Sequence, residues 1–127
     1  MGRTRNAVGP QGPRGFKSLS LLMKKYKLIV FVPVSDAEKV REAIHVAGGG
    51  KLGNYSHCSF SSRGTGRFKP ETGSNPSVGK IGKIEEVEEK KVEILCEENV
   101  IRDCVSAMKK AHPYEEVAYD VIETADF

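Results

Sequence analysis

A strand-and-helix pattern that occurs twice along the chain constrains the fold more than any other feature. The first copy is the apolar run KLIVFVP, residues 27–33, followed by SDAEKVREAIHVAGG, residues 35–49. The run is typical of a strand buried on both faces. The segment after it places Ala37, Val40, Ile44 and Ala47 on one helical face. Ser35 and Glu38 have the spacing of a capping box, and Gly48 suits the left-handed end of a helix.

The second copy is KKVEILCEENVIRDCVSAMKKAHP, residues 90–113. It predicts a strand over 92–96 and then a helix that ends before Pro113. The buried stripe of that helix is predicted to be Ile101, Cys104 or Val105, Met108 and Ala111.

Each helix is followed by a further strand, predicted over NYSHCSFSS, residues 54–62, and VAYDVIE, residues 117–123. The order β-α-β-β-α-β is that of a ferredoxin-like α+β sandwich. We expect an antiparallel sheet with both helices on one face, because both crossover connections are right-handed.

That arrangement leaves the other sheet face bare. Alternation places Leu28, Val30 and Val32 on one face of the first strand and Ile29 and Phe31 on the other, which Leu95 and Ile122 are expected to share. An uncovered apolar face of this kind marks an interface. The sequence therefore predicts that sheet faces pack together between subunits.

Charge and composition exclude several classes of protein. The net charge of +3 arises in residues 1–22, which carry Arg3, Arg5, Arg14 and Lys17 and no acidic residue. We interpret residues 1–24 as a flexible basic tail containing glycine and proline, and residues 25–127 as a single domain. A nearly neutral body does not favour nucleic-acid binding. No apolar run is long enough to span a membrane, and three cysteines without a CxxC pair favour a reduced, cytoplasmic protein.

Residues 61–89 are rich in glycine and are predicted to form a long loop. The segment RGTGRF lacks the ending of a nucleotide-binding P-loop. Glycine backbone and nearby cationic side chains can nevertheless bind an anion. The predicted anion site consists of Arg63, Gly64, Gly66, Arg67 and Lys69, with subunit packing as the alternative role for this loop.

Three segments carry a family likeness: AGGGKLGNYSHCSF, GTGRFKPETGSNPSVGKIG and AHPYEEVAYDV, residues 47–60, 64–82 and 111–121. In this order they resemble the domain inserted into YqfO-type Nif-three-like proteins, which is similar to CutA and the PII signalling proteins. The chain looks like a standalone copy of that module. The resemblance implies a homotrimer with clefts between subunits and a regulatory or ligand-sensing role. It carries over no metal ligand, because the two-metal domain of those proteins is absent.

The remaining candidate residues lie at the helix-to-strand corner, where His112, Glu115 and Glu116 are expected to line or brace a cleft. A weak cation site there is an open alternative. No catalytic residue and no metal ligand set is predicted, because the three histidines are scattered and the cysteines suit core packing.

We therefore expect a regulatory module that binds an anionic small ligand or a protein partner, with no cofactor named by the sequence. The alternatives are a small metal-assisted hydrolase with His112 as base and a structural partner of a two-metal Nif-three-like protein.

Overall fold

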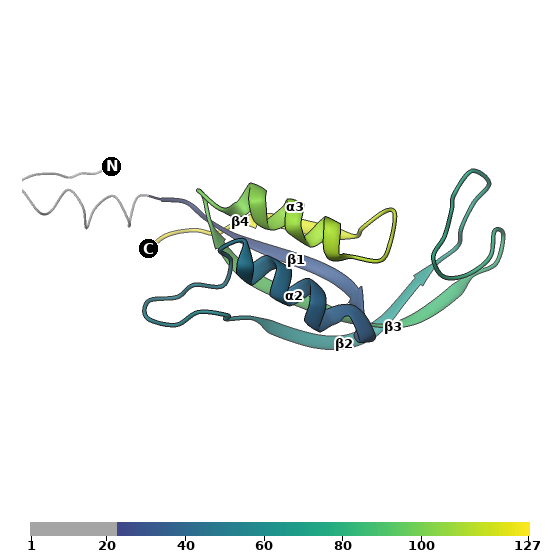
Figure 1. The fold of residues 1–127 in the computed structure, drawn as a ribbon, viewed down its shortest axis with the longest axis horizontal. Coiled ribbons are helices and arrows are strands. Elements are labelled where there is room, and N and C mark those ends of the chain that lie inside the picture. The colour runs from purple at the N-terminus through teal and green to yellow at the C-terminus, as the bar shows by residue number, and fades with distance from the viewer. Residues whose placement is uncertain (1–22) are drawn as a thin grey trace, which may run out of the picture.

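A computed structural model describes residues 23–127 as a four-stranded sheet with two helices packed against it (Figure 1). The predicted tail lies almost wholly outside the described residues. The elements are β1 (Lys25–Pro33), the 3-10 turn η2 (Val34–Asp36), α2 (Ala37–Val46), β2 (Phe60–Phe68), β3 (Glu85–Glu97), α3 (Ile101–Ala111) and β4 (Tyr119–Glu123). The predicted ferredoxin-like fold is confirmed.

The strand order in the sheet is β2-β3-β1-β4, and every neighbouring pair is antiparallel. The central pair has Val30 of β1 opposite Val92 of β3, and Tyr119 of β4 lies opposite Val30 on the other side. Since directly opposed residues share a face of the sheet, the register fixes which side chains meet the helices.

The hydrophobic core lies between the sheet and the two helices. The side chains buried there share one face of the sheet or the inner stripe of a helix: Leu28, Val30, Val32, Ala37, Val40, Ile44, Val92, Ile94, Cys96, Ile101, Cys104 and Met108. Both predicted helical stripes are confirmed by this set, with Ala47, Val105 and Ala111 packed at its margin. At about 25 cal/mol per Å² of buried apolar area, this layer is the main source of stability.

The end of α2 depends on closely packed glycines. Gly48 has a φ of +112° and donates its N–H to the His45 carbonyl, as predicted for a helix end. A Cβ on Gly49 would lie 2.8 Å from the Ile44 side chain and 3.0 Å from the Cys96 sulfur. The predicted capping box at the start of α2 is wrong. Ser35 lies in η2 and bonds the Asp36 carboxylate instead of capping the helix.

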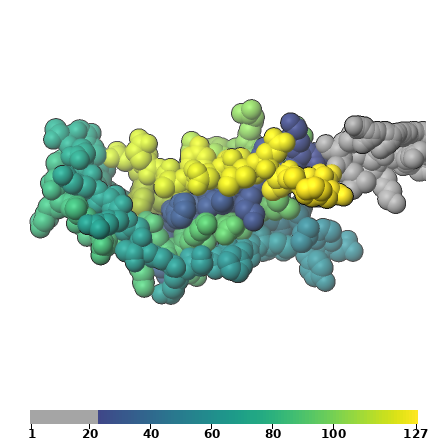
Figure 2. All heavy atoms as spheres, turned by 180° about the vertical axis from the view of Figure 1, so that it is seen from behind, coloured from purple at the N-terminus to yellow at the C-terminus, as the bar shows by residue number. Residues whose placement is uncertain are grey.

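The second face of the sheet has no helix over it. Figure 2 shows this face, where the colours of β4, β1, β3 and β2 follow one another from top to bottom. It carries Phe31, Leu95, Phe60 and Ile122, of which Phe60 is 67% exposed and Ile122 50% exposed. We call these four residues the open-face patch.

The strands around the glycine-rich segment differ from the prediction. The strand expected over residues 54–62 begins only at Phe60, and His57 before it has a φ of +59°. β2 then continues through RGTGRF to Phe68, and β3 begins at Glu85, so the loop expected over residues 61–89 spans only residues 69–84. The physical reason is ladder pairing: Arg63 to Phe68 each face a β3 residue, and this pairing outweighs the weak strand propensity of glycine.

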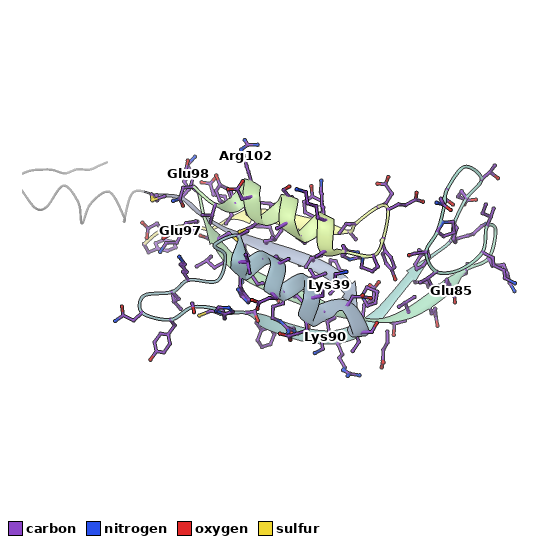
Figure 3. The ribbon with its side chains drawn as sticks, in the orientation of Figure 1. Lys39, Glu85, Lys90, Glu97, Glu98 and Arg102 are labelled. Carbon is purple, nitrogen blue, oxygen red and sulfur yellow. The ribbon has the colours of Figure 1, made fainter. Side chains whose placement is uncertain are left out.

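β2 and β3 together form an arm that extends beyond the helices. Glu85 lies out along this arm, whereas Glu97, Glu98 and Arg102 lie at the opposite end of the molecule (Figure 3). No helix within residues 23–127 is long and apolar enough to cross a bilayer.

Candidate functional site

A pocket of about 350 Å³ lies where the arm meets the corner between α3 and β4. Its lining comes from four separated parts of the chain: one residue of β1, the end of β2 with the following loop, one residue of β3, and the corner itself. The lining residues are Phe31, Gly66, Arg67, Phe68, Lys69, Pro70, Glu71, Ser74, Pro76, Ser77, Val78, Glu89, Tyr114, Glu115, Glu116 and Ala118. This volume falls within the range of small-molecule sites.

The floor of the pocket depends on Gly66 and Glu89. Glu89 of β3 is only 9% exposed, although it lies in a strongly charged segment. A Cβ on Gly66 would lie 2.2 Å from the Glu89 Oε1 atom and 2.3 Å from its Cδ atom. The Glu89 carboxylate therefore occupies the space that a side chain at Gly66 would take, so glycine at this position is a condition for the buried carboxylate.

Tyr114 forms a wall of the same pocket. Its ring contacts the Phe68 ring, with centroids 5.8 Å apart, and the His112 ring, with centroids 5.0 Å apart. Its hydroxyl is buried and lies near the Glu89 side chain, which it can reach as a donor, although neither that contact nor any other among the described residues has the geometry of a standard hydrogen bond. Burial and the nearby charge of Glu89 raise the pKa of Tyr114 to about 12. The hydroxyl is thus a neutral donor at physiological pH.

His112 braces this corner from beneath. It is 7% exposed, its Nε2 atom lies 2.8 Å from the Phe31 carbonyl, and its Nδ1 atom lies 3.1 Å from the Tyr114 backbone N–H. Since a carbonyl accepts and an amide donates, Nε2 carries the proton and Nδ1 accepts. Both ring nitrogens are engaged, so this histidine has no free lone pair to act as a base or to bind a metal. The role predicted for His112, lining or bracing a cleft, stays a prediction.

Glu115 and Glu116 line the pocket at its mouth. The Glu115 Oε2 atom accepts a hydrogen bond of 2.8 Å from the backbone N–H of Asn75. This bond ties the loop of residues 69–84 to the corner. Glu116 is exposed beside it and has no ion pair within the described part of the chain.

The five residues of the predicted anion site are not brought together as one cradle. Gly64 and Gly66 lie in a paired strand, so their backbone does not wrap a ligand. Arg63 lies outside the pocket, 3.6 Å from Glu88, and the Arg67 Nε atom lies 3.8 Å from Glu86. Gly66, Arg67 and Lys69 do line the pocket, which they share with Glu115 and Glu116. Two candidate groups that the sequence placed apart therefore meet.

Charge in the pocket is mainly negative. Its lining contains the cationic side chains Arg67 and Lys69 and four carboxylates, those of Glu71, Glu89, Glu115 and Glu116. The sequence analysis missed Glu89 and Tyr114. Tyr114 stands in the quoted HPYEE segment and could have been found there, whereas Glu89 is one of many glutamates in its segment and has no local signal.

The other reactive side chains are parts of the core or of the surface. Cys96 and Cys104 are buried against each other, and the hydrogen bond with Cys104 together with burial raises the pKa of the Cys96 thiol. The His45 Nδ1 atom lies 3.1 Å from the Gly49 carbonyl oxygen. The centroids of the His45 and His57 rings are 4.8 Å apart. Across residues 23–127, no three His, Cys, Asp or Glu side chains are placed to hold a metal ion together.

Comparison with known proteins places this domain. No family model matches the chain. It is 54% identical over 101 residues to the GTP cyclohydrolase 1 type 2 homolog of Halalkalibacterium halodurans, a match that covers 80% of this chain and 27% of that protein. The Bacillus subtilis GTP cyclohydrolase 1 type 2 homolog is 48% identical over 95 residues, covering 75% of this chain and 26% of the relative.

Solved structures agree. A Bacillus cereus protein related to NIF3 superposes with a TM-score of 0.70 at 48% identity, covering 80% of this chain and 26% of that one. CutA1 from Pyrococcus horikoshii superposes with a TM-score of 0.59 at 20% identity, covering 80% of this chain and 85% of CutA1. The second likeness concerns the fold alone.

The extent of these matches limits what they transfer. The chain spans about a quarter of the length of the curated relatives it matches, 27% and 26% in the two cases above. By contrast, it covers most of CutA1. The chain is thus identified as the counterpart of one segment of the GTP cyclohydrolase 1 type 2 homologs and NIF3-related proteins, and that segment has a CutA-like fold.

Proposed function

We propose that this domain is a regulatory binding module that takes a small ligand, or a side chain of a protein partner, in the pocket between the arm and the corner. One observation carries the proposal: four separated segments line a pocket of about 350 Å³ that contains a largely buried carboxylate without a cationic partner and, near it, a buried hydroxyl without a hydrogen bond of standard geometry. Buried polar groups normally have partners, so such a cavity is suited to a ligand that supplies them.

The geometry favours binding over hydrolysis. A general base needs a free lone pair within reach of the proton that it takes, and both nitrogens of His112 are occupied. Cys96 and Cys104 are buried away from the pocket, which lies on the other side of the sheet. The name of the curated relatives refers to a cyclohydrolase, but this chain matches about a quarter of their length. In this proposal the domain binds a ligand or partner and does not carry out a reaction.

The proposal includes self-association through the open-face patch. Phe60 and Ile122 are the most exposed members of this patch, and water-exposed aromatic and aliphatic side chains on one sheet face favour packing against a second apolar surface. A homotrimer, as the PII-like resemblance implies, would place the pocket near a subunit boundary, because Phe31 belongs both to the patch and to the pocket lining. We also propose a cytoplasmic location, which three free cysteines support.

A ligand screen tests the binding role. Thermal shift and calorimetry with nucleotides, phosphates, carboxylates and amines should reveal at least one class that stabilises the protein, because a ligand that binds the native state alone raises its melting temperature. The substitution Ala118→Leu, which places a larger side chain at the pocket wall, should abolish that stabilisation. Ala125→Leu, at an exposed position near the C-terminus, is the matched control.

Two results would contradict the proposal. One is the absence of any binding across all four classes at millimolar concentration together with self-association that Ala118→Leu leaves unchanged, because neither a free ligand nor a partner side chain would then occupy the pocket. The other is binding that Ala118→Leu leaves unchanged, because the ligand would then lie elsewhere.

A further inference from the structure

The environment of Glu89 is unusual for a carboxylate. The residue is 9% exposed, and no Lys, Arg or His within residues 23–127 lies close enough to form an ion pair with it. Burying most of a carboxylate without a cationic partner is costly, and buried charges are normally paired. Gly66 leaves the space that this carboxylate fills. The fold therefore accommodates an acceptor whose cation the described chain does not supply.

The surroundings of Glu89 match a cationic partner. Phe31, Phe68 and Tyr114 supply aromatic surface to the same pocket, and Pro70, Pro76 and Val78 supply apolar surface. Aromatic faces attract ammonium and guanidinium groups, because the ring quadrupole places negative potential over the face. The apolar residues suit the stem that carries such a group.

The carboxylates at the mouth of the pocket also favour a cationic ligand. Glu71, Glu115 and Glu116 line it, and Glu115 uses one oxygen on the Asn75 amide. Of the two cationic lining residues, Arg67 lies beside Glu86. An anion entering the pocket would meet the Glu89 carboxylate at its floor, whereas a cation would meet four carboxylates in the lining against two cationic side chains, Arg67 and Lys69.

We propose that the pocket binds a cationic head group, a primary ammonium or a guanidinium, carried on an apolar or aromatic stem, with Glu89 as its counter-ion. This inference rests on the binding role proposed above and names the ligand class. The head group lies against the Glu89 carboxylate, and the stem lies along Phe31, Phe68 and Tyr114. The group belongs either to a free organic amine or to a Lys or Arg side chain of a second copy of this chain.

The test uses n-butylammonium and n-butylguanidinium as probes, with butyrate and 1-butanol as the anionic and neutral equivalents. Binding to the full chain is followed by NMR shifts of the Gly66 and Tyr114 amides. The cations should shift these amides and the two equivalents should not. Glu89→Gln keeps the shape and removes the charge, so it should weaken cation binding at least about tenfold.

Glu88→Gln is the matched control for Glu89→Gln. Glu88 is the preceding residue, it points to the opposite face of β3, and it pairs with Arg63 outside the pocket. This variant should change cation binding less than about twofold. Sedimentation velocity of both variants distinguishes the source of the head group. If the cation comes from a second copy, free probes shift nothing, and Glu89→Gln but not Glu88→Gln weakens self-association at least about tenfold.

The proposal is overturned if butyrate or inorganic phosphate binds the pocket more tightly than the cations do. It is also overturned if Glu89→Gln changes neither cation binding nor self-association. These failures are distinct from failure of the binding role, because a pocket that binds an anionic or neutral ligand and is blocked by Ala118→Leu would keep that role and lose only the ligand class.

Discussion

Gly66 shows how the absence of one side chain determines the chemistry of the pocket. Gly64 and Gly66 lie on the same face of the same strand, but a Cβ on Gly64 would meet nothing within 4 Å, whereas a Cβ on Gly66 would overlap the Glu89 carboxylate. The carboxylate is the flexible end of its side chain, so it can move. Its movement would empty the pocket floor without disrupting the sheet.

Gly66→Ala should therefore lower the pKa of Tyr114 from about 12 toward its ordinary value of 10.0. Burial of the phenol, the larger cause, remains and keeps the pKa above 10.0, whereas the contribution of Glu89 is lost. Ultraviolet titration of the tyrosinate band, with Tyr114→Phe as the difference reference, measures this change. Gly64→Ala is the control and should leave the titration as in the parent protein. An equal change in both variants would mean that strand stiffness and not Glu89 sets the pKa.

The raised pKa of Tyr114 also makes stability depend on pH. The folded-state pKa of about 12 exceeds the ordinary 10.0, so the folded protein keeps a proton that the unfolded chain loses. The contribution of this group to the free energy of unfolding is complete below pH 10 and is lost as the pH rises from about 10 to about 12. A pKa difference of this size corresponds to at most about 2.7 kcal/mol.

Urea denaturation of the parent protein and Tyr114→Phe tests this linkage. Between about pH 9 and about pH 11.5 the parent protein should lose more free energy of unfolding than the variant, by about 1 kcal/mol, since the partial exposure of Tyr114 to solvent reduces the ideal value. The difference between the two proteins removes the contribution of all other titrating groups, because both proteins contain them. Parallel pH profiles for the two proteins would show that Tyr114 ionises alike in the folded and unfolded states.

At the scale of elements, the loop of residues 69–84 is held by few bonds. The Gly82 N–H donates to the Pro70 carbonyl at 2.7 Å, which closes the loop on itself. The bond from the Asn75 N–H to Glu115 joins it to the corner. Since loops open locally at low cost when few contacts hold them, the second bond should control how often the pocket opens.

Glu115→Ala should speed hydrogen exchange at the Asn75 amide by about tenfold, because a hydrogen bond to a charged acceptor contributes about 1.5 kcal/mol. Mass spectrometry of peptides covering the loop would measure this. Glu116→Ala, a neighbouring exposed carboxylate without that bond, should leave exchange unchanged. If both variants behave alike, the bond does not restrain the loop.

The same elements show what could be predicted from sequence. β1, α2 and α3 were predicted well, because each has a strong apolar period that a single packing face requires: Leu28, Ile44 and Met108 are each fully buried. β2 was misplaced because an edge strand rich in glycine buries little, and its position is decided by pairing with β3. The charged start of β3 has no apolar period from which a strand could be predicted, because it too is positioned by strand pairing. Burial of Glu89 depends on that pairing and on Gly66, so it could not be predicted locally.

At the scale of the whole molecule, the two faces of the sheet differ in how they are covered. One face is closed by α2 and α3, and the other is bare (Figures 1 and 2). Exposed apolar residues also occur on the helix side, for example Val46 of α2, which is 78% exposed. Single exposed residues of that kind are normal, whereas the open-face patch combines residues from all four strands. This contrast provides a matched pair of substitutions.

Phe60→Lys and Ile122→Lys should each weaken self-association by at least about tenfold, since placing a charge in an apolar interface costs more than about 1.4 kcal/mol. Both positions are more than one third exposed in the single chain, at 67% and 50%, so the fold itself should tolerate the change. Circular dichroism would confirm folding, and light scattering after size exclusion would give the mass.

Val46→Lys is the control, because it adds the same charge to a more exposed apolar position on the helix side. It should leave the mass unchanged. A strict monomer of the parent protein would contradict association through the bare face, and dissociation by Val46→Lys alone would place the interface on the helices. If the open-face variants become monomers and also lose cation binding, the pocket is completed by a second copy. If the open-face variants become monomers and still bind the cation, a single chain forms the complete pocket.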